Sequence, residues 1–211
     1  RKSLDIEPRF EDAHNNLGYA LAKLGKNAEA IAHYESALKI KPDLVEAHNN
    51  LGNSLAEIGR VDEAIEHYKI ALAKNPMHAD AHNNYGVALA MKGRLPEAVE
   101  QFHKSLEAKP DYASAHSNLG NAYAVQGKFD EAMVEYFACL KTKPDDSQAH
   151  NNLANVLAQK GRTAEAMEHY FASLKLNAKN PEANFNLGLL LVRQGKREDA
   201  LAHFREALRQ K

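Results

Sequence analysis

The stretch AHNNLG at residues 47–52 copies a stretch that begins 34 residues earlier, at Ala13. Close copies begin at Ala81, Ala115, Ala149 and Ala183, again at the same spacing. A fixed period of this length is typical of repeat proteins, in which each repeat is a small structural unit that stacks on its neighbours. The 34-residue period is therefore the feature from which we predict the fold.

The period divides the chain into six repeats without an insertion, and residues 1–10 match the end of a preceding repeat. We predict one continuous domain with these repeats: 11–44, 45–78, 79–112, 113–146, 147–180 and 181–211. Positions within a repeat are counted below from its first residue, so that Glu11 and Val45 both hold the first position.

Two helices are predicted in each repeat. In the second repeat, apolar residues recur at steps of three and four from Ala47 to Ile58 and again from Ala64 to Leu72, which is the helical period. Gly59 separates the two stripes, and glycine suits a helix end because it adopts positive φ without steric cost. Pro76 ends the second stripe, since proline cannot continue a helix. The chain is therefore predicted to be all-α, with two antiparallel helices per repeat.

These residues resemble the tetratricopeptide repeat family, whose unit is a helix–turn–helix of the same length. The second repeat shows the family pattern in Leu51-Gly52, Ala64, Tyr68, Ala71 and Pro76. The pattern recurs over nearly the whole chain, but histidine usually stands where the family often has Trp or Tyr, as at His48. The resemblance implies a right-handed superhelix, an α-solenoid, whose concave groove is lined by the first helix of each repeat.

Asparagines form a polar stripe along the predicted first helices. The sixth position is always asparagine, and we call these residues the ladder asparagines: Asn16, Asn50, Asn84, Asn118, Asn152 and Asn186. The fifth position adds Asn15, Asn49, Asn83 and Asn151, and the ninth position adds Asn53, Asn121 and Asn155. An amide side chain can bind both the N–H and the C=O groups of an extended peptide, so all these residues are candidate peptide-binding residues. The alternative is that their amides bridge neighbouring helices.

The predicted function is that of a scaffold that binds an extended segment of a protein partner. The asparagine-lined groove resembles the repeat region of O-linked N-acetylglucosamine transferase, which implies a second hypothesis: a substrate-recognition region of a larger glycosyltransferase. Other members of the family clamp a C-terminal carboxylate with Lys and Arg, but the matching positions here hold Asn and Ser.

Composition and motifs exclude several other classes. Lys plus Arg is 27 and Asp plus Glu is 28, so no basic excess favours nucleic acid. No apolar run is long enough to span a bilayer. No catalytic motif is present, and we expect neither an enzyme nor a cofactor. Successive repeats separate the histidines at the fourth position too far for a shared metal ion, so we expect packing or surface roles. The single cysteine, Cys139, suits a buried position and a reducing compartment, and we expect a cytoplasmic location.

The predicted last helix carries apolar residues with no helix after them to cover them. Leu201 and Leu208 lie on its apolar stripe. Solenoids need polar end repeats for solubility, so we expect end-to-end self-association of this chain.

Overall fold

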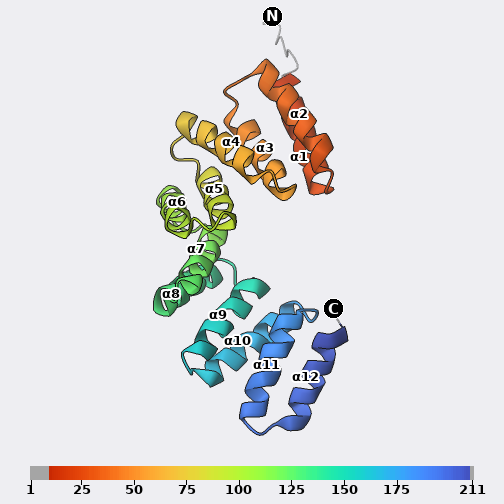
Figure 1. The fold of residues 1–211 in the computed structure, drawn as a ribbon, viewed down its shortest axis with the longest axis vertical. Helices are drawn as coiled ribbons and strands as arrows, with labels where there is room; N and C mark the ends of the chain where they lie inside the picture. Colours follow the sequence, from red (N-terminus) through yellow and green to blue (C-terminus); the bar gives the residue numbers. More distant parts are fainter. Residues whose placement is uncertain (1–9, 210–211) are drawn as a thin grey trace, which may run out of the picture. The chain divides into compact units, whose positions relative to one another are not determined.

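The structure is a computed structural model that describes residues 10–209, and these residues form paired α-helices without a strand among them (Figure 1). The predicted preceding repeat lies, except for Phe10, outside the described residues. The helices are α1 Phe10–Lys23, α2 Asn27–Ile40, α3 Val45–Glu57, α4 Val61–Lys74, α5 Ala79–Met91, α6 Leu95–Ala108, α7 Ala113–Val125, α8 Phe129–Thr142, α9 Ser147–Gln159, α10 Thr163–Leu176, α11 Pro181–Arg193 and α12 Arg197–Arg209.

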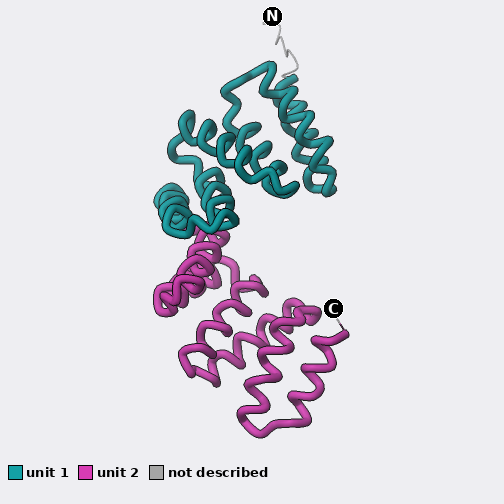
Figure 2. Tube along the Cα trace, in the orientation of Figure 1, with its two compact units in different colours: residues 1–110 teal, residues 111–211 magenta. Residues whose placement is uncertain are grey.

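The chain forms two compact units, one up to Pro110 with α1–α6 and one from Asp111 with α7–α12 (Figure 2). In each unit the two helices of a repeat pack against each other. The second helix of a repeat also packs against the first helix of the next repeat, as α2 does against α3 and α8 against α9. The prediction of an all-α repeat fold is therefore confirmed.

The turn between paired helices is built around a glycine with positive φ. Gly59 has φ of 82° after α3, and its N–H donates to Ala56 O at 3.0 Å. The N–H of Arg60 donates to Leu55 O at 2.9 Å, which completes a Schellman motif. The guanidinium of Arg60 then pairs with Glu63 at the start of α4, at 2.6 Å. One turn thus ends the first helix and begins the second.

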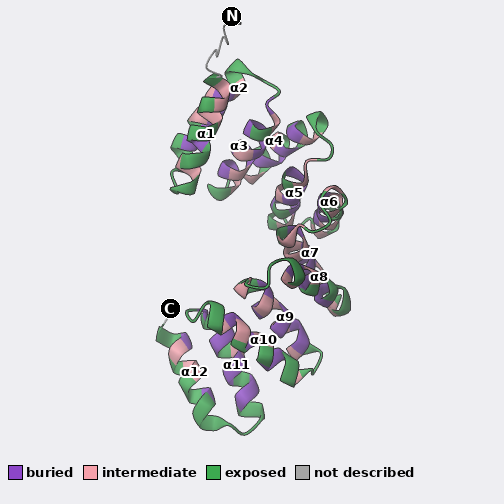
Figure 3. Ribbon diagram, turned by 180° about the vertical axis from the view of Figure 1, so that it is seen from behind, coloured by how far each residue is buried: buried purple, intermediate pink, exposed green. Residues whose placement is uncertain are grey.

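An aromatic ring fills the space between the two helices of each repeat. Tyr68 of α4 is buried against Gly52 of α3, where an added Cβ would lie 2.6 Å from the ring. The glycine therefore lets the ring approach the backbone of the first helix. The fifth repeat has Ala154 at this position opposite Tyr170, and both residues are buried. Figure 3 shows the buried residues along the packed sides of the helices and exposed residues in the turns.

Candidate peptide-binding surface

The predicted polar stripe lies on adjacent helices. Contacts join the first helices of neighbouring repeats, α1 to α3 and α3 to α5 in one unit and α7 to α9 in the other. The ladder asparagines from Asn50 to Asn186 are half-buried on these helices, and Asn16 is exposed. Each unit therefore presents its ladder asparagines along a single surface.

Four ladder asparagines donate to asparagines of the preceding repeat. In the first unit, Asn50 Nδ2 donates to Asn15 Oδ1 at 3.1 Å and Asn84 Nδ2 donates to Asn49 Oδ1 at 3.0 Å. In the second unit the acceptor is a ninth-position asparagine instead, since Asn152 Nδ2 donates to Asn121 Oδ1 at 2.7 Å and Asn186 Nδ2 donates to Asn155 Oδ1 at 2.9 Å. The bridging role considered from the sequence is thus present in the structure. The bridge uses one of the two N–H groups of each amide. Asn84 Oδ1 also accepts from Asn83, and Asn152 Oδ1 accepts from Gln148 at 2.8 Å and from Asn151 at 3.4 Å.

The fifth-position asparagines have little exposed surface. Asn49, Asn83 and Asn151 are buried, and Asn15 is half-buried. Asn15 and Asn49 accept the hydrogen bonds from the ladder. Asn83 and Asn151 instead donate to the ladder residues of their own repeats, Asn84 at 3.3 Å and Asn152 at 3.4 Å, so all four lie behind the ladder and help to orient its amides.

The ninth-position asparagines accept hydrogen bonds from buried tyrosines. Tyr68 donates to Asn53 at 2.7 Å, and the same bond joins Tyr136 to Asn121 at 2.7 Å and Tyr170 to Asn155 at 2.6 Å. Burial raises the pKa of each of these tyrosines, so each hydroxyl stays a donor.

In the third and sixth repeats, the aromatic residue of the second helix and the ninth-position residue of the first helix change together. The third repeat has Phe102 with Val87, and the sixth has Phe204 with Leu189, so the hydroxyl and its acceptor are both absent. The first repeat is different, since it combines Tyr34 with a tyrosine, Tyr19, at the ninth position. The sequence analysis missed this pairing, although a comparison of the two positions across the repeats contains it.

Three pockets lie on the ladder surface at equivalent places in the repeat. The pocket between the first and second repeats has a volume of about 400 Å³ and is lined by Tyr34 and Asn50. The pocket between the second and third repeats has about 460 Å³ and is lined by Tyr68 and Asn84. The pocket between the fifth and sixth repeats has about 380 Å³ and is lined by Tyr170 and Asn186. Each pocket therefore has a ladder asparagine in its wall.

The side chains around these pockets differ from one pocket to the next. Val87 and Met91 give the second pocket an apolar wall, and Leu189 and Arg193 line the third. Lys23 and Glu57 line both pockets of the first unit. The repeated amide is thus combined with side chains that vary.

Histidines join the two helices of a repeat. The Nδ1 atoms of His48 and His67 lie 2.9 Å apart, and the same pairing joins His14 to His33 at 3.0 Å and His150 to His169 at 2.9 Å. His48 Nε2 donates to the carbonyl oxygen of Pro42 at 3.0 Å, so the neutral ring accepts at Nδ1 from the N–H of His67. The third repeat replaces the second histidine by Gln101, which bonds His82 at 2.8 Å.

The described residues contain no group of three or more side chains suited to a metal ion. The histidine pairs connect the two helices of a repeat. Cys139 is buried, and burial raises the pKa of its thiol to about 11, which keeps the sulfur in its protonated, unreactive form. No helix within residues 10–209 has the length and apolar character needed to cross a bilayer.

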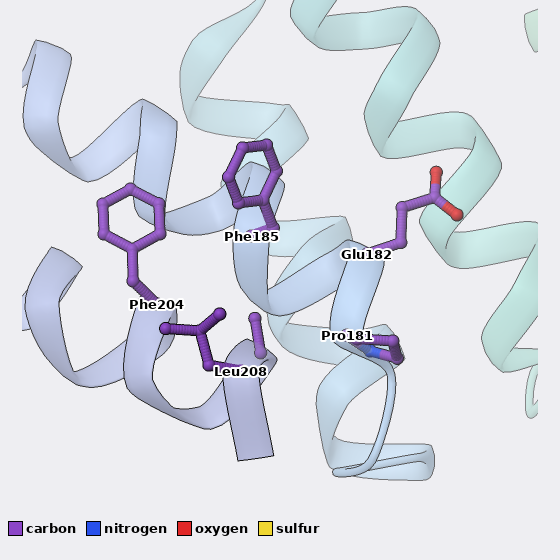
Figure 4. Close-up of a pocket in the computed structure, with 6 residues that line it drawn as sticks. Pro181, Glu182, Phe185, Phe204 and Leu208 are labelled. Carbon is purple, nitrogen blue, oxygen red and sulfur yellow. The ribbon is translucent and has the colours of Figure 1, made fainter. Parts of the chain in front are cut away.

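A fourth pocket, of about 440 Å³, lies between α11 and α12 (Figure 4). Phe185, Phe204 and Leu208 give it an apolar lining, and Glu182 lies at its edge. The pocket is part of the apolar surface of the last repeat.

The first prediction concerns the tyrosine–asparagine pair of the second repeat. Replacing Asn53 by Val leaves the buried Tyr68 hydroxyl without its acceptor, which should lower the free energy of unfolding by about 1–3 kcal/mol. Adding Tyr68→Phe should recover most of the loss, because the double variant reproduces the Val87–Phe102 pair of the third repeat. Thermal unfolding of the wild type, both single variants and the double variant measures the coupling. Additive effects of the two changes would contradict the pairing.

The second prediction concerns the stability of the folded chain at acidic pH. Burial, followed by the charge of His48, lowers the pKa of His67; nearby Glu63 and Glu35 oppose this shift and Arg60 adds to it. Burial, followed by His150, lowers the pKa of His169 against the opposing effect of Glu168 and Glu165. The unfolded chain takes up protons at these histidines near about pH 6.5, before the folded chain does. Their contribution to stability is therefore present above that pH and is lost as the pH falls toward the lowered pKa values.

The expected result is a lower melting temperature at about pH 5.5 than at about pH 7.5, with a smaller difference in the His67→Gln/His169→Gln variant. Glutamine is the matched replacement because Gln101 already pairs with His82. An equal acid response of the variant and the wild type would show that these two histidines do not cause it.

Comparisons with known proteins identify the repeat. Family profiles described as tetratricopeptide or TPR repeats match residues 18–59 and 154–195, 49–113, 89–156 and 181–211. No curated protein sequence matches the chain. These matches do not support the narrower resemblance to O-linked N-acetylglucosamine transferase.

Solved structures share the fold. The chain is similar to PilF of Pseudomonas aeruginosa, with 22% identity and a TM-score of 0.85 over 92% of this chain and 88% of that one. A thermophilic TPR protein of Thermus thermophilus has 26% identity and a TM-score of 0.71, over 86% and 99% of the two chains. YrrB, described as a TPR protein with an unusual peptide-binding site, has 21% identity and a TM-score of 0.68, over 84% and 92%. The chain belongs to the tetratricopeptide repeat family, whose members are generally protein-interaction scaffolds.

Proposed function

We propose that this protein is a scaffold that binds an extended peptide segment of a partner protein along the ladder surface. The observation that carries the proposal is the fixed orientation of the ladder amides. One N–H of Asn50, Asn84, Asn152 and Asn186 is held by the preceding repeat, which orients the rest of each amide before a ligand arrives. Such preorganisation reduces the entropy cost of binding.

The spacing of the repeats suits a peptide backbone. Packed helices lie about 8–10 Å apart, and an extended chain advances about 3.3 Å per residue, so one ladder asparagine would meet about every third residue of the ligand. The pockets beside the asparagines would then take side chains of the bound segment. YrrB is described as peptide-binding, and this likeness supports the general function.

The residues proposed to contact the ligand are the ladder asparagines and the ninth-position asparagines. The buried fifth-position asparagines would act by orienting the ladder. No observation favours the glycosyltransferase alternative. A cytoplasmic location, like the absence of nucleic acid from the partners, stays a prediction.

The third prediction tests the ladder. Replacing Asn84, Asn118 and Asn152 together by Ala should weaken the binding of many unrelated peptides by at least about tenfold, because several backbone hydrogen bonds are lost at once. The peptides are first selected from a random displayed library on the wild-type chain, and their affinities are measured by titration below the melting temperature of each variant.

Asn49→Ala is the matched control. It removes the acceptor that holds Asn84 and leaves the Asn84 amide in place, so it should lower the melting temperature with a smaller effect on peptide affinity. If the folded triple variant bound the selected peptides as tightly as the wild type does, the ladder would not be the binding site.

The proposal extends to end-to-end self-association. Leu201 is 52% exposed and Leu208 is 70% exposed, whereas Ile65 and Met133, which match Leu201 in earlier repeats, are buried. At the other end, Leu17 is 48% exposed, although Leu51 and Leu153 at the same position are buried. Apolar residues at positions that are buried in other repeats are therefore exposed on α1 and α12.

The fourth prediction is that light scattering shows a mean mass that rises with concentration. Leu201→Glu/Leu208→Glu should reduce this rise, because burying a carboxylate in the apolar contact is unfavourable. Val134→Glu is the control, since Val134 is an exposed apolar residue in the middle of the repeats. A wild-type chain that remained monomeric at high concentration would contradict the proposal.

A further inference from the structure

The pocket between the first and second repeats differs from its equivalents in the hydroxyl groups that line it. Tyr34 and Ser54 line this pocket, and Tyr19, Lys23 and Asn50 also contribute to its walls. The inference below rests on the proposed function, because it concerns a side chain of the peptide bound along the ladder.

Ser54 has a buried hydroxyl that makes no hydrogen bond. The residue is 2% exposed, and Ser54 Oγ has no partner among the described residues. Leaving a buried polar atom unpaired costs free energy, so such atoms in native proteins usually have a role.

The fold does not require this hydroxyl. The tenth position of the other repeats is always apolar, with these residues: Ala20, Ala88, Ala122, Val156 and Leu190. Serine therefore stands at a packing position that an alanine fills in three other repeats.

Tyr34 also lacks the acceptor that its equivalents have. Tyr68, Tyr136 and Tyr170 donate to a ninth-position asparagine, but the first repeat has Tyr19 at that position. Burial raises the pKa of Tyr34 to about 12, and interaction with the neighbouring Ser54 hydroxyl opposes part of this rise. The Tyr34 hydroxyl is thus a protonated donor at neutral pH.

The remaining polar groups add further donors. Asn53 Oδ1 accepts from Tyr68, which leaves the amide N–H groups of Asn53 to donate. Lys23 contributes an ammonium group, and Glu57 is the one acid that lines the pocket. Several hydrogen-bond donors therefore line this pocket, among them the hydroxyl groups of Tyr34 and Ser54.

We propose that this pocket binds the oxygen acceptor of a side chain on the bound segment, with Ser54 and Tyr34 as donors. The group is a carboxylate or a carboxamide, so the residue is Asp, Glu, Asn or Gln. Ser54 is the specificity-determining residue, since the hydroxyl gains a partner when such a ligand is bound. A ligand that puts an apolar side chain here leaves both hydroxyls unpaired and binds more weakly.

The test uses the full chain and peptides selected on it from a random displayed library. Selected peptides should share an Asp, Glu, Asn or Gln at one register position. Synthetic versions with Glu, Gln or norleucine at that position then distinguish the carboxylate, the carboxamide and a side chain of similar size without oxygen. Replacing the acceptor by norleucine should weaken binding to the wild-type chain by about fivefold to tenfold.

Ser54→Ala should remove most of this preference while the peptide still binds. The variant should fold, because alanine occupies the equivalent positions Ala20, Ala88 and Ala122, and its melting temperature should equal or exceed that of the wild type. Ser36→Ala is the control, since it removes a hydroxyl that bonds Ala32 O on α2, outside the pocket.

The outcomes separate the two proposals. Ladder-dependent peptides that bind equally well with norleucine, or a preference that survives in Ser54→Ala, would overturn the inference and leave the proposed function standing. Selected peptides that bind the Asn84→Ala/Asn118→Ala/Asn152→Ala variant as tightly as the wild type would overturn the proposed function, and the inference with it.

Discussion

Every repeat depends on the contact between an aromatic ring of the second helix and the backbone of the first. The glycine opposite the ring, such as Gly52 opposite Tyr68, removes the side chain that would keep the two helices apart. The ring then fills the interior of the helix pair, and burial of its apolar surface stabilises the repeat. Because the ring occupies this space, the hydroxyl of a tyrosine emerges beneath the ladder surface, where Asn53 accepts from it. The core of a repeat and its candidate binding surface are therefore connected through one residue.

The asparagines join stability to recognition in the same way. An amide that only bridged helices would need one donor and one acceptor, and the bond from Asn84 to Asn49 is of this kind. An amide on a half-buried surface retains further hydrogen-bonding capacity. Bridging and peptide binding, which the sequence presents as alternatives, are therefore compatible roles of one side chain. The bridge fixes the orientation in which the remaining N–H would meet a ligand.

The sequence predicted the helix pairs and their ends because the period, the turn glycines and the prolines act locally. Gly59 and Pro76, for instance, restrict the backbone wherever they occur. The partners of the polar side chains were harder to predict, because they depend on which residues meet across two helices. The pairing of His48 with His67 joins residues from two helices, and each histidine set considered alone gives no sign of it. The burial of Asn49 behind Asn50 likewise depends on how the helix is rotated about its axis. A polar stripe in the sequence does not determine this rotation to within one residue.

The differences between repeats carry information that the consensus does not. A substitution that preserves packing and pairing, such as Phe102 with Val87 in place of a tyrosine and an asparagine, is explained by the fold alone. Ser54 is not explained in this way, since it adds a polar group at an apolar position and gains no partner within the described residues. In a repeat protein the other repeats serve as internal controls for what the fold requires at each position. A residue that departs from them at a cost in stability, and that lines a pocket on the candidate binding surface, is best accounted for by a ligand.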